Sequence, residues 1–349
     1  MVHFFPIFSR NAGTTEFGHA LRRIGVEHRI FSDSLSLRYK SRLVLLFVHI
    51  PRLMWFAGKM GIASLALCRP IPDVVVLGSD IEVLIFALLR ALTGRGGVRI
   101  VLGSFIFTSR RSGWQNRLRH FYYRFVLSHV DMAIVHSRME VDQNAKIFPG
   151  LHTQFRFVPW GTNIDSRQQL LGDARFASGG ENVIVTAGRS ERDYGTLFRA
   201  MDGVGAELRV ICDYLKEKPS EALSARITLL SDCYGDAYLR ELVDATLVVV
   251  PVAAGQISAG QMVLIQSMGL GKAIIVTDTP TIRDYVTDRH DAWLVPMGDA
   301  AAMQEAILHL LQNPQECERL GRNARDTFDA KLSAEGHLRG LVNAINETA

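Results

Sequence analysis

Cysteine is scarce in this sequence, and the patterns that would give it a function are absent. The 349 residues contain four cysteines, with no C-x-x-C pair and no histidine at the spacing of a zinc ligand. We therefore expect reduced thiols, which are typical of a cytoplasmic chain. The four residues are Cys68, Cys212, Cys233 and Cys317.

Long apolar runs are also absent. The runs Leu43–Pro51 and Gly61–Cys68 each stop at an arginine, well short of the ~18 to 20 residues that span a bilayer. The opening Met1–Ser9 is apolar but short, lacks a basic leader and contains a proline, so we predict a first strand and no signal peptide. We expect a cytoplasmic chain that crosses no membrane and is not exported.

Several motifs of nucleotide enzymes and hydrolases are missing. Neither a G-x-G-x-x-G fingerprint nor a G-x-S-x-G elbow is present, which argues against a dinucleotide-linked oxidoreductase and a hydrolase. Gly269–Ala273 resembles a phosphate loop, but that loop needs glycine at Gln266 and serine or threonine at Ala273. No Asp-x-Asp occurs, and Asp80-Ile81-Glu82 is its nearest substitute, so we expect neither a bound metal nor any other cofactor.

What is present is a globular composition with strands and helices in alternation. Hydrophobic residues make up 48% and charged residues 21%, which rules out a disordered or fibrous protein. Short apolar runs recur, each followed by a helix-like stretch, and this pattern predicts buried parallel strands. The predicted strands are Val2–Phe8, Asp73–Gly78, Val98–Gly103, Met132–His136, Arg156–Pro159, Val183–Ala187, Leu208–Cys212, Ile227–Leu230, Thr246–Pro251, Ala273–Thr277 and Ala292–Val295.

This alternation predicts an α/β fold of two doubly wound, Rossmann-like domains. Glycines among polar residues favour a linker over 166–180, which separates domains at 1–165 and 181–330. A helix over 331–349 is expected to pack back on the first domain. Because ligands of such sheets lie beyond the carboxyl ends of the strands, we expect the site in a cleft between the two domains.

Charge divides the two halves sharply. Residues 1–165 carry 21 Lys+Arg and 10 Asp+Glu, or +11, whereas residues 166–349 carry 18 and 25, or −7. The first half therefore favours an anionic partner. The stretches 38–56 and 110–124 mix cations with aromatic residues, as helices that lie on membrane surfaces do, although 38–69 also fits two core helices broken at Pro51.

The second half contains a candidate seat for a diphosphate. After the expected strand that ends at Pro251, a helix is predicted to start near Ser258, with Gly260 leaving its first N–H groups open to an anion. A helix dipole adds only ~0.3 to 1 kcal/mol, so tight binding needs cations. Arg189 and Arg192 follow another strand and can grip phosphate oxygens.

Taken together, these segments resemble the GT-B fold glycosyltransferases, in particular the retaining family four (glycosyl transferases group 1). The resemblance covers most of the chain. It implies a donor site for a UDP- or GDP-linked sugar that includes the phosphate-binding residues above. The residues that carry it are Gly188-Arg189, Gln261–Lys272, Thr277–Pro280, Asp284–Val286 and Phe157–Asp165, and the implied donor site comprises Gly188, Arg189, Arg192, Ser258, Ala259, Gly260, Gln261 and Gln266.

The sequence departs from this family at two positions. Where the family places two glutamates eight residues apart, this chain has Ser258 and Gln266, which cannot act as carboxylates. Gln266 can still hydrogen-bond a ribose, and Arg192 falls near the family's phosphate-binding lysine. The family also tends to have a histidine after a strand of the first domain, and none follows the strands at 73–78 and 98–103.

The resemblance implies a retaining transfer to a glycan or a lipid-linked acceptor, as in surface polysaccharide synthesis. Gly13 and Thr14, after the first strand, are the candidate acceptor or phosphate loop. If a general base takes part, Glu16 and Asp80 are the candidates. His136 lies on an apolar element and is expected to be a satisfied core residue.

Two other functions stay open at this stage. A relative that binds the donor without catalysis would explain the lost carboxylates at Ser258 and Gln266. A nucleic-acid-binding protein would use the basic half, although no reading motif is present and we expect no such partner. For the enzyme, a place at the inner face of the plasma membrane would suit both the basic half and a lipid-linked acceptor.

Overall fold

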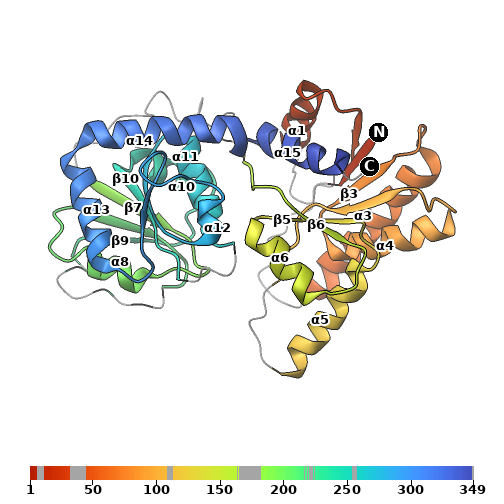
Figure 1. The fold of residues 1–349 in the computed structure, drawn as a ribbon, viewed down its shortest axis with the longest axis horizontal. Coiled ribbons are helices and arrows are strands. Elements are labelled where there is room, and N and C mark those ends of the chain that lie inside the picture. The colour runs from red at the N-terminus through yellow and green to blue at the C-terminus, as the bar shows by residue number, and fades with distance from the viewer. Residues whose placement is uncertain are drawn as a thin grey trace. The chain divides into compact units, whose positions relative to one another are not determined.

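The computed structural model describes residues 1–5, 12–31, 45–107, 113–162, 164, 182–215, 217, 219, 223, 225–253 and 258–347. Contacts divide the chain into one unit of Met1–Val158 with Leu338–Ala349 and a second unit of Pro159–His337. The predicted linker 166–180 lies outside the described residues. Each unit is a parallel sheet with helices packed on it (Figure 1).

The sheet of the first unit has six strands in the order β2-β1-β3-β4-β5-β6, and every neighbouring pair is parallel. Five of these strands confirm the expected ones. The sixth, β2, was missed because it is short and two of its three residues are polar. The strands are β1 (Val2–Phe5), β2 (His28–Ile30), β3 (Val74–Leu77), β4 (Arg99–Leu102), β5 (Met132–Val135) and β6 (Gln154–Phe157).

Helices cover both faces of this sheet because its strands are apolar on both sides. Val75 and Leu77 of β3 lie in a cluster with α3, α4 and α5, whereas Val74 and Val76 lie in a cluster with α1 and α15. The helices are α1 (Ala12–Arg23), η1 (Leu45–His49), α3 (Ile50–Ile62), η2 (Ala63–Leu67), α4 (Asp80–Leu92), α5 (Trp114–Leu127), α6 (Arg138–Ile147) and α15 (Ala334–Asn346).

The run from Leu45 to Leu67 is helical throughout, so the expected break at Pro51 is wrong. Pro51 lies in the first turn of α3, where a missing N–H does no harm, and the wider turns of η1 precede it. No helix among the described residues is long and apolar enough to cross a bilayer.

The C-terminal residues return to the first unit. Leu338 and Leu341 of α15 are buried in the cluster that includes Val76 of β3, and Arg99 Nη1 donates to the carbonyl of Ile345 at 3.3 Å. The first core is therefore completed by the last residues of the chain.

The second unit repeats the architecture, with strand order β12-β11-β10-β7-β8-β9 and parallel pairing throughout. All six strands were expected, and the predicted fold of two doubly wound, Rossmann-like units is confirmed. The strands are β7 (Val183–Ala187), β8 (Glu207–Ile211), β9 (Ile227–Leu230), β10 (Leu247–Val250), β11 (Ala273–Thr277) and β12 (Trp293–Val295).

Alternate residues of β10 face two cores in this unit. Val248 and Val250 pack with α10, α11 and η4, whereas Leu247 and Val249 pack with α8 and α13. The helices are α8 (Tyr194–Ala200), α10 (Asp236–Asp244), α11 (Gln261–Gly269), α12 (Pro280–Arg283), α13 (Ala300–Gln312), α14 (Pro314–Thr327) and η4 (Phe328–Leu332).

Candidate functional site

The turn after β7 is shaped by a glycine that no larger residue could replace without strain. Gly188 has a φ of +105°, and a Cβ there would lie 2.5 Å from Nη2 of Arg192. Both backbone polar groups of Gly188 are also hydrogen-bonded. Its N–H donates to the carbonyl of Ile211 at 3.0 Å, and its carbonyl accepts from the Tyr194 hydroxyl. The turn is therefore fixed in place against β8 and α8.

Arg192 is anchored close to this turn. Its Nε donates to the carbonyl of Ala187 at 2.8 Å and its Nη1 to that of Ser190 at 2.9 Å. Burial lowers the pKa of Arg192 from its ordinary value, but arginine begins so high that it keeps its charge at neutral pH. The result is a cation held rigidly at the carboxyl end of β7.

Hydrogen bonds connect this turn to the segment after β10. Asp193 N–H donates to Pro251 at 3.2 Å, and Ala253 N–H donates to Glu191 at 3.0 Å. Nη1 of Arg192 lies 3.8 Å from the position that a Cβ on Gly260 would take. The two segments that the sequence singled out for phosphate binding are thus neighbours.

The helix after β10 begins later than expected. Gly260, with a φ of +91°, is the N-cap residue and Gln261 is the first residue of α11, so the prediction that Ser258 caps this helix is wrong. A Cβ on Gly260 would lie 3.0 Å from Val250 Cγ1, so close approach to β10 requires glycine at the turn itself. Ala259 and Gln261 on either side are buried.

A pocket of about 360 Å³ lies at the carboxyl ends of β7 and β8, where the fold rule places a ligand. It is lined by three residues of the predicted donor site, Gly188, Arg189 and Gln266. Arg189 is exposed, so its guanidinium is accessible to a ligand. The other lining residues are Ala187, Ile211, Cys212, Asp213, Cys233, Tyr234, Gly235, Tyr238, Met262 and Val263.

Several polar groups that line this pocket are hydrogen-bonded to each other. The Tyr238 hydroxyl donates to Gln266 Oε1 at 3.0 Å, and burial raises the pKa of Tyr238. Asp213 accepts from the Tyr234 hydroxyl and from the Asp232 N–H, and these bonds lower the pKa of the Asp213 carboxyl. A carboxylate therefore lies beside Arg189 in the lining.

Sequence reasoning missed Asp213, Tyr234 and Tyr238. The signal was available for the first two, because polar and aromatic residues directly follow β8 and β9 and parallel strands end at a common edge. Tyr238 lies within α10, where sequence gives no sign of the side of the helix that faces the pocket.

The candidates of the first unit lie in helix starts. The backbone of Gly13, Thr14 and Glu16 belongs to the first turns of α1, so the predicted loop is wrong: the helix begins at Ala12. Their side chains lie outside the described residues. Asp80 is in the first turn of α4, and its Oδ2 accepts from the Tyr122 hydroxyl at 2.9 Å.

His136 has the core role that was expected. It is fully buried, with Nε2 2.9 Å from Ser104 Oγ and Nδ1 3.0 Å from the carbonyl of Val158. Among the described residues, no group of three or more His, Cys, Asp or Glu is placed to hold a metal ion.

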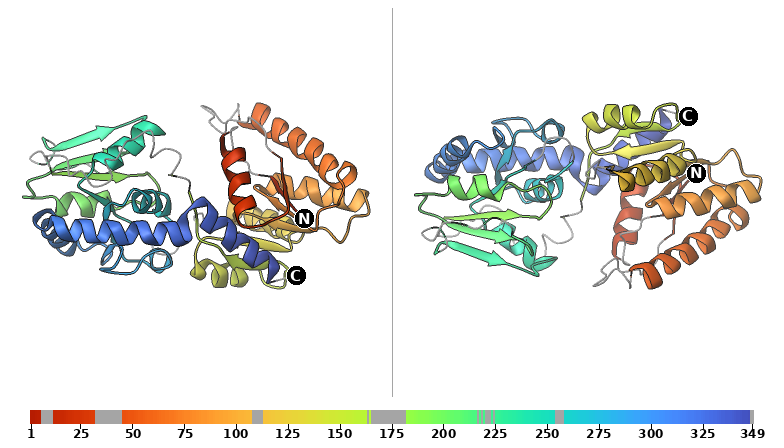
Figure 2. Two further views of the ribbon diagram at one scale, coloured as in Figure 1. Left: turned by 90° about the horizontal axis from the view of Figure 1, so that it is seen from above. Right: turned by 90° about the horizontal axis from the view of Figure 1, so that it is seen from below.

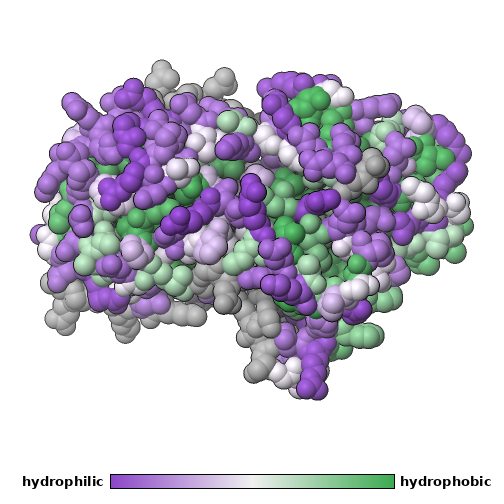
Figure 3. Space-filling view, viewed as in Figure 1, coloured by the Kyte–Doolittle hydropathy of each residue, from purple (hydrophilic) through white to green (hydrophobic). Residues whose placement is uncertain are grey.

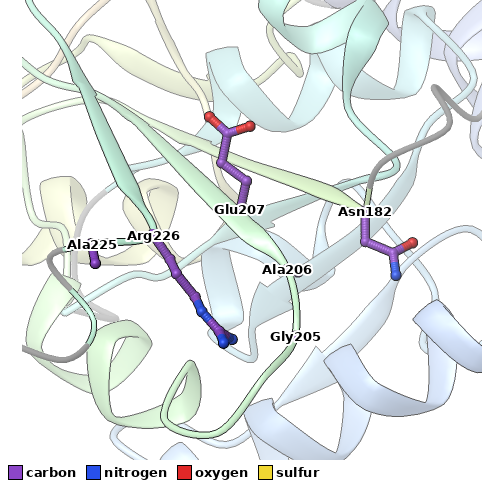
Figure 4. A pocket seen from close by; sticks show the side chains of 6 residues that line it. All are labelled: Asn182, Gly205, Ala206, Glu207, Ala225 and Arg226. Carbon is purple, nitrogen blue, oxygen red and sulfur yellow. The ribbon is translucent and has the colours of Figure 1, made fainter.

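A second pocket, of about 510 Å³, lies at the opposite ends of β7 and β8 and contains none of the predicted residues (Figure 4). Its charged side chains have partners nearby: Glu207 pairs with Arg209 at 3.0 Å, and Arg226 Nη1 donates to Val204 at 2.9 Å. The side chains of Asn182, Glu207 and Arg226 point in different directions in Figure 4, so they do not converge on a ligand.

The second unit of this chain is similar to a known protein family. Residues 181–313 match the family model described as glycosyl transferases group 1. That range contains every residue of the predicted donor site. A search of curated proteins finds no match.

Several solved structures share the GT-B type of fold with this chain. Sucrose-phosphate synthase from Thermosynechococcus elongatus is 18% identical with a TM-score of 0.66, over 100% of this chain and 99% of that one. Anabaena HepE, in complex with UDP-glucose, is 12% identical with a TM-score of 0.62, over 99% of both chains. A glycosyltransferase from Rickettsia africae is 12% identical with a TM-score of 0.63, over 99% of this chain and 98% of that one.

Proposed function

We propose that this chain, whose residues 181–313 match the glycosyl transferases group 1 family and whose fold is of the GT-B type, is a glycosyltransferase that uses a nucleotide-diphosphate sugar. The observation that carries the proposal is that Gly188, Arg192 and Gly260 lie close together, and that Gly188 also lines the pocket with Arg189 and Gln266. Two guanidiniums and an open helix start match the two charged groups of a diphosphate.

In this proposal the pocket holds the nucleoside and the arginines hold the diphosphate. Gln266, oriented by Tyr238, offers its amide to the ribose hydroxyls. The HepE structures contain UDP or UDP-glucose, which favours a UDP-linked donor here and leaves GDP as the alternative. Because the arginines neutralise the diphosphate, we propose a transfer that needs no metal ion.

The reaction we propose is a retaining transfer of a hexose or a related sugar. The bond from the anomeric carbon to the diphosphate oxygen breaks, and the diphosphate leaves with the electron pair. An acceptor hydroxyl bonds to that carbon on the same face, and its proton passes to the leaving phosphate. Preorganised donors such as Arg189 and Arg192 stabilise the departing charge, and one such donor contributes about 3 to 4 kcal/mol in well-studied enzymes.

The acceptor in this proposal is a glycan or a lipid-linked glycan of a surface polysaccharide or glycoconjugate. The basic first half of the chain, with its net charge of +11 from 21 Lys+Arg and 10 Asp+Glu, is suited to an anionic acceptor or lipid. The cleft expected between the domains stays a prediction.

Thermal-shift measurements with nucleoside diphosphates and their sugars test the donor site. A ligand at a hundredfold excess over its Kd stabilises the folded state by ~2.7 kcal/mol. We expect a shift with UDP or GDP compounds and its loss in Arg189→Ala. Arg322→Ala is the control, because Arg322 is exposed on α14 and does not line the pocket. An unchanged shift in Arg189→Ala would refute the phosphate assignment.

The alternative is a donor-binding relative without catalysis, which the side chains at Ser258 and Gln266 favour. Slow hydrolysis of the donor in the absence of acceptor separates the two functions. We expect free UDP or GDP to accumulate with the wild-type chain and not with Arg189→Ala. Binding without any turnover would identify the inactive relative.

A further inference from the structure

Three helices of the first unit lie in one layer. α3 contacts α4, α4 contacts α5, and all three pack on the same face of the sheet through buried residues that include Phe56, Phe86 and Leu127. Figure 2 shows them side by side. Their opposite sides therefore form a common outer surface.

This outer surface is unusually apolar. Of the nineteen large hydrophobic residues exposed in the described part of the chain, twelve lie on this layer and its flanking turns. Figure 3 shows part of this hydrophobic surface over the region of α3 and α4. We call these twelve residues the apolar face: Phe47, Val48, Met54, Trp55, Ile62, Leu67, Leu88, Leu92, Trp114, Leu118, Phe121 and Phe125.

On α5 the exposed apolar residues lie on one side of the helix. Trp114, Leu118, Phe121 and Phe125 follow one another at intervals of four, three and four residues, so they form one stripe along the helix. The core contacts of α5 come from other residues, such as Val126. The exposed stripe is therefore additional to what the fold needs.

The charges on this layer of helices are mostly basic. The three helices contain 6 Lys+Arg, and α3 and α5 contain no Asp or Glu. The two acids of α4 lie in its first turn, where Glu82 is buried and Asp80 accepts a hydrogen bond from Tyr122. Lys59 on α3 and Arg117 on α5 are exposed beside residues of the apolar face. An occupant must therefore combine an apolar interior with a negatively charged surface.

We propose that the apolar face docks on an anionic lipid bilayer. Helices with large apolar residues on one side and flanking cations lie in the plane of the membrane interface, and tryptophan favours the headgroup level. A second copy of the chain fits less well, because both surfaces would bring mostly cations, with no acids from α3 or α5 to pair with them. Nucleic acid has the required negative charge, but it offers no apolar surface against which twelve large apolar side chains could be buried.

Sedimentation of the full chain with vesicles tests this proposal without any nucleotide. We expect binding to vesicles of phosphatidylcholine with phosphatidylglycerol, and at least tenfold weaker binding to phosphatidylcholine alone. Leu118→Gln with Phe121→Gln should weaken binding tenfold or more. Arg117→Gln should weaken it about fivefold, equivalent to ~1 kcal/mol per basic residue at an anionic surface.

The control variant is Met297→Gln with Leu308→Gln, which changes two exposed apolar residues of the second unit and should bind as the wild type does. Absence of binding to anionic vesicles, or undiminished binding by the α5 variant, would overturn the proposal. So would a dimer in size-exclusion chromatography that the α5 variant abolishes, or retention of RNA in place of vesicles. The UDP or GDP thermal shift should be unchanged in the α5 variant, so failure here is distinguishable from failure of the donor site.

Discussion

At the scale of the residue, Gly188 determines where Arg192, the anchored cation of the proposed donor site, can lie. Its φ of +105° leaves the guanidinium of Arg192 packed over the bare Cα, 2.5 Å from the place of a Cβ. We therefore expect Gly188→Ala to displace Arg192 and to weaken binding of UDP or GDP more than tenfold, as measured by titration calorimetry.

Gly203→Ala is the matched control for this prediction. Gly203 also has a positive φ, of +74°, but nothing lies within 4 Å of its Cβ position. Both variants should lose about 1 to 2 kcal/mol from the left-handed backbone alone. Equal nucleotide affinity in both variants would show that the position of Arg192 does not matter for the donor.

Gln266 is the second residue whose role can be separated from its packing. Gln266→Glu keeps an acceptor for the Tyr238 hydroxyl, now 3.0 Å from Oε1, and restores the carboxylate of the related family. We expect its nucleotide affinity to equal or exceed that of the wild type. Gln266→Leu leaves that half-buried hydroxyl without its acceptor, which should cost about 0.5 to 1.5 kcal/mol of stability in urea unfolding.

Particular residues show how far the site was predictable. Gly188 and Arg189 were named because they follow a predicted strand and carry the family resemblance, Gln266 was named because it stands where the family has a glutamate, and the structure brings all three to one pocket. The Ser258 cap was wrong because Gly260, whose Cβ position lies 3.0 Å from Val250 of β10, is the N-cap. A favoured capping residue two positions earlier in the sequence does not report this packing against the strand.

At the scale of the element, the start of α4 contains a buried acid that should make stability depend on pH. Glu82 Oε2 accepts from the N–H groups of Gly78 and Ser79 at 2.9 and 3.0 Å, and the Ser79 hydroxyl completes the capping box. Burial outweighs these bonds and raises the pKa of Glu82 from 4.5 to about 7.

The folded state consequently binds a proton that the unfolded state releases between pH 4.5 and 7. Stability contributed by this group is present at low pH and is lost as the pH rises through that window, by on the order of 3 kcal/mol. We expect Glu82→Gln to flatten the pH dependence of urea unfolding between pH 5 and 8. Glu318→Gln, at an exposed position on α14, should leave it unchanged.

Elements differed in how well the sequence predicted them. The β3 and β10 strands were recognisable because parallel strands buried on both faces are continuous apolar runs. β2 was missed because His28–Ile30 is short and partly polar, and its place in the sheet comes from pairing with β1. Pro51 was misread because its position in a first turn, where proline is tolerated, depends on where η1 ends.

At the scale of the whole molecule, the chain closes its first unit with its last helix. α15 buries Leu338 and Leu341 against the first sheet, although 179 residues of the second unit, Pro159–His337, intervene. The sequence predicted a returning helix, and the contacts assign Leu338–Ala349 to the first unit. The stability of that unit therefore depends on residues translated after the whole second unit.

This dependence leads to opposite expectations for two similar core substitutions. Leu338→Ala on α15 and Leu310→Ala on α13 each remove a fully packed leucine and should cost about 2 to 5 kcal/mol. In scanning calorimetry we expect two transitions. UDP or GDP should raise the midpoint temperature of one transition, that of the second unit, and leave the other unchanged. Leu338→Ala should lower only the midpoint that the nucleotide leaves unchanged, and Leu310→Ala should lower only the midpoint that the nucleotide raises. A single transition whose midpoint both substitutions lower equally would mean that the two units unfold as one, with the proposed donor site coupled to the stability of the first unit.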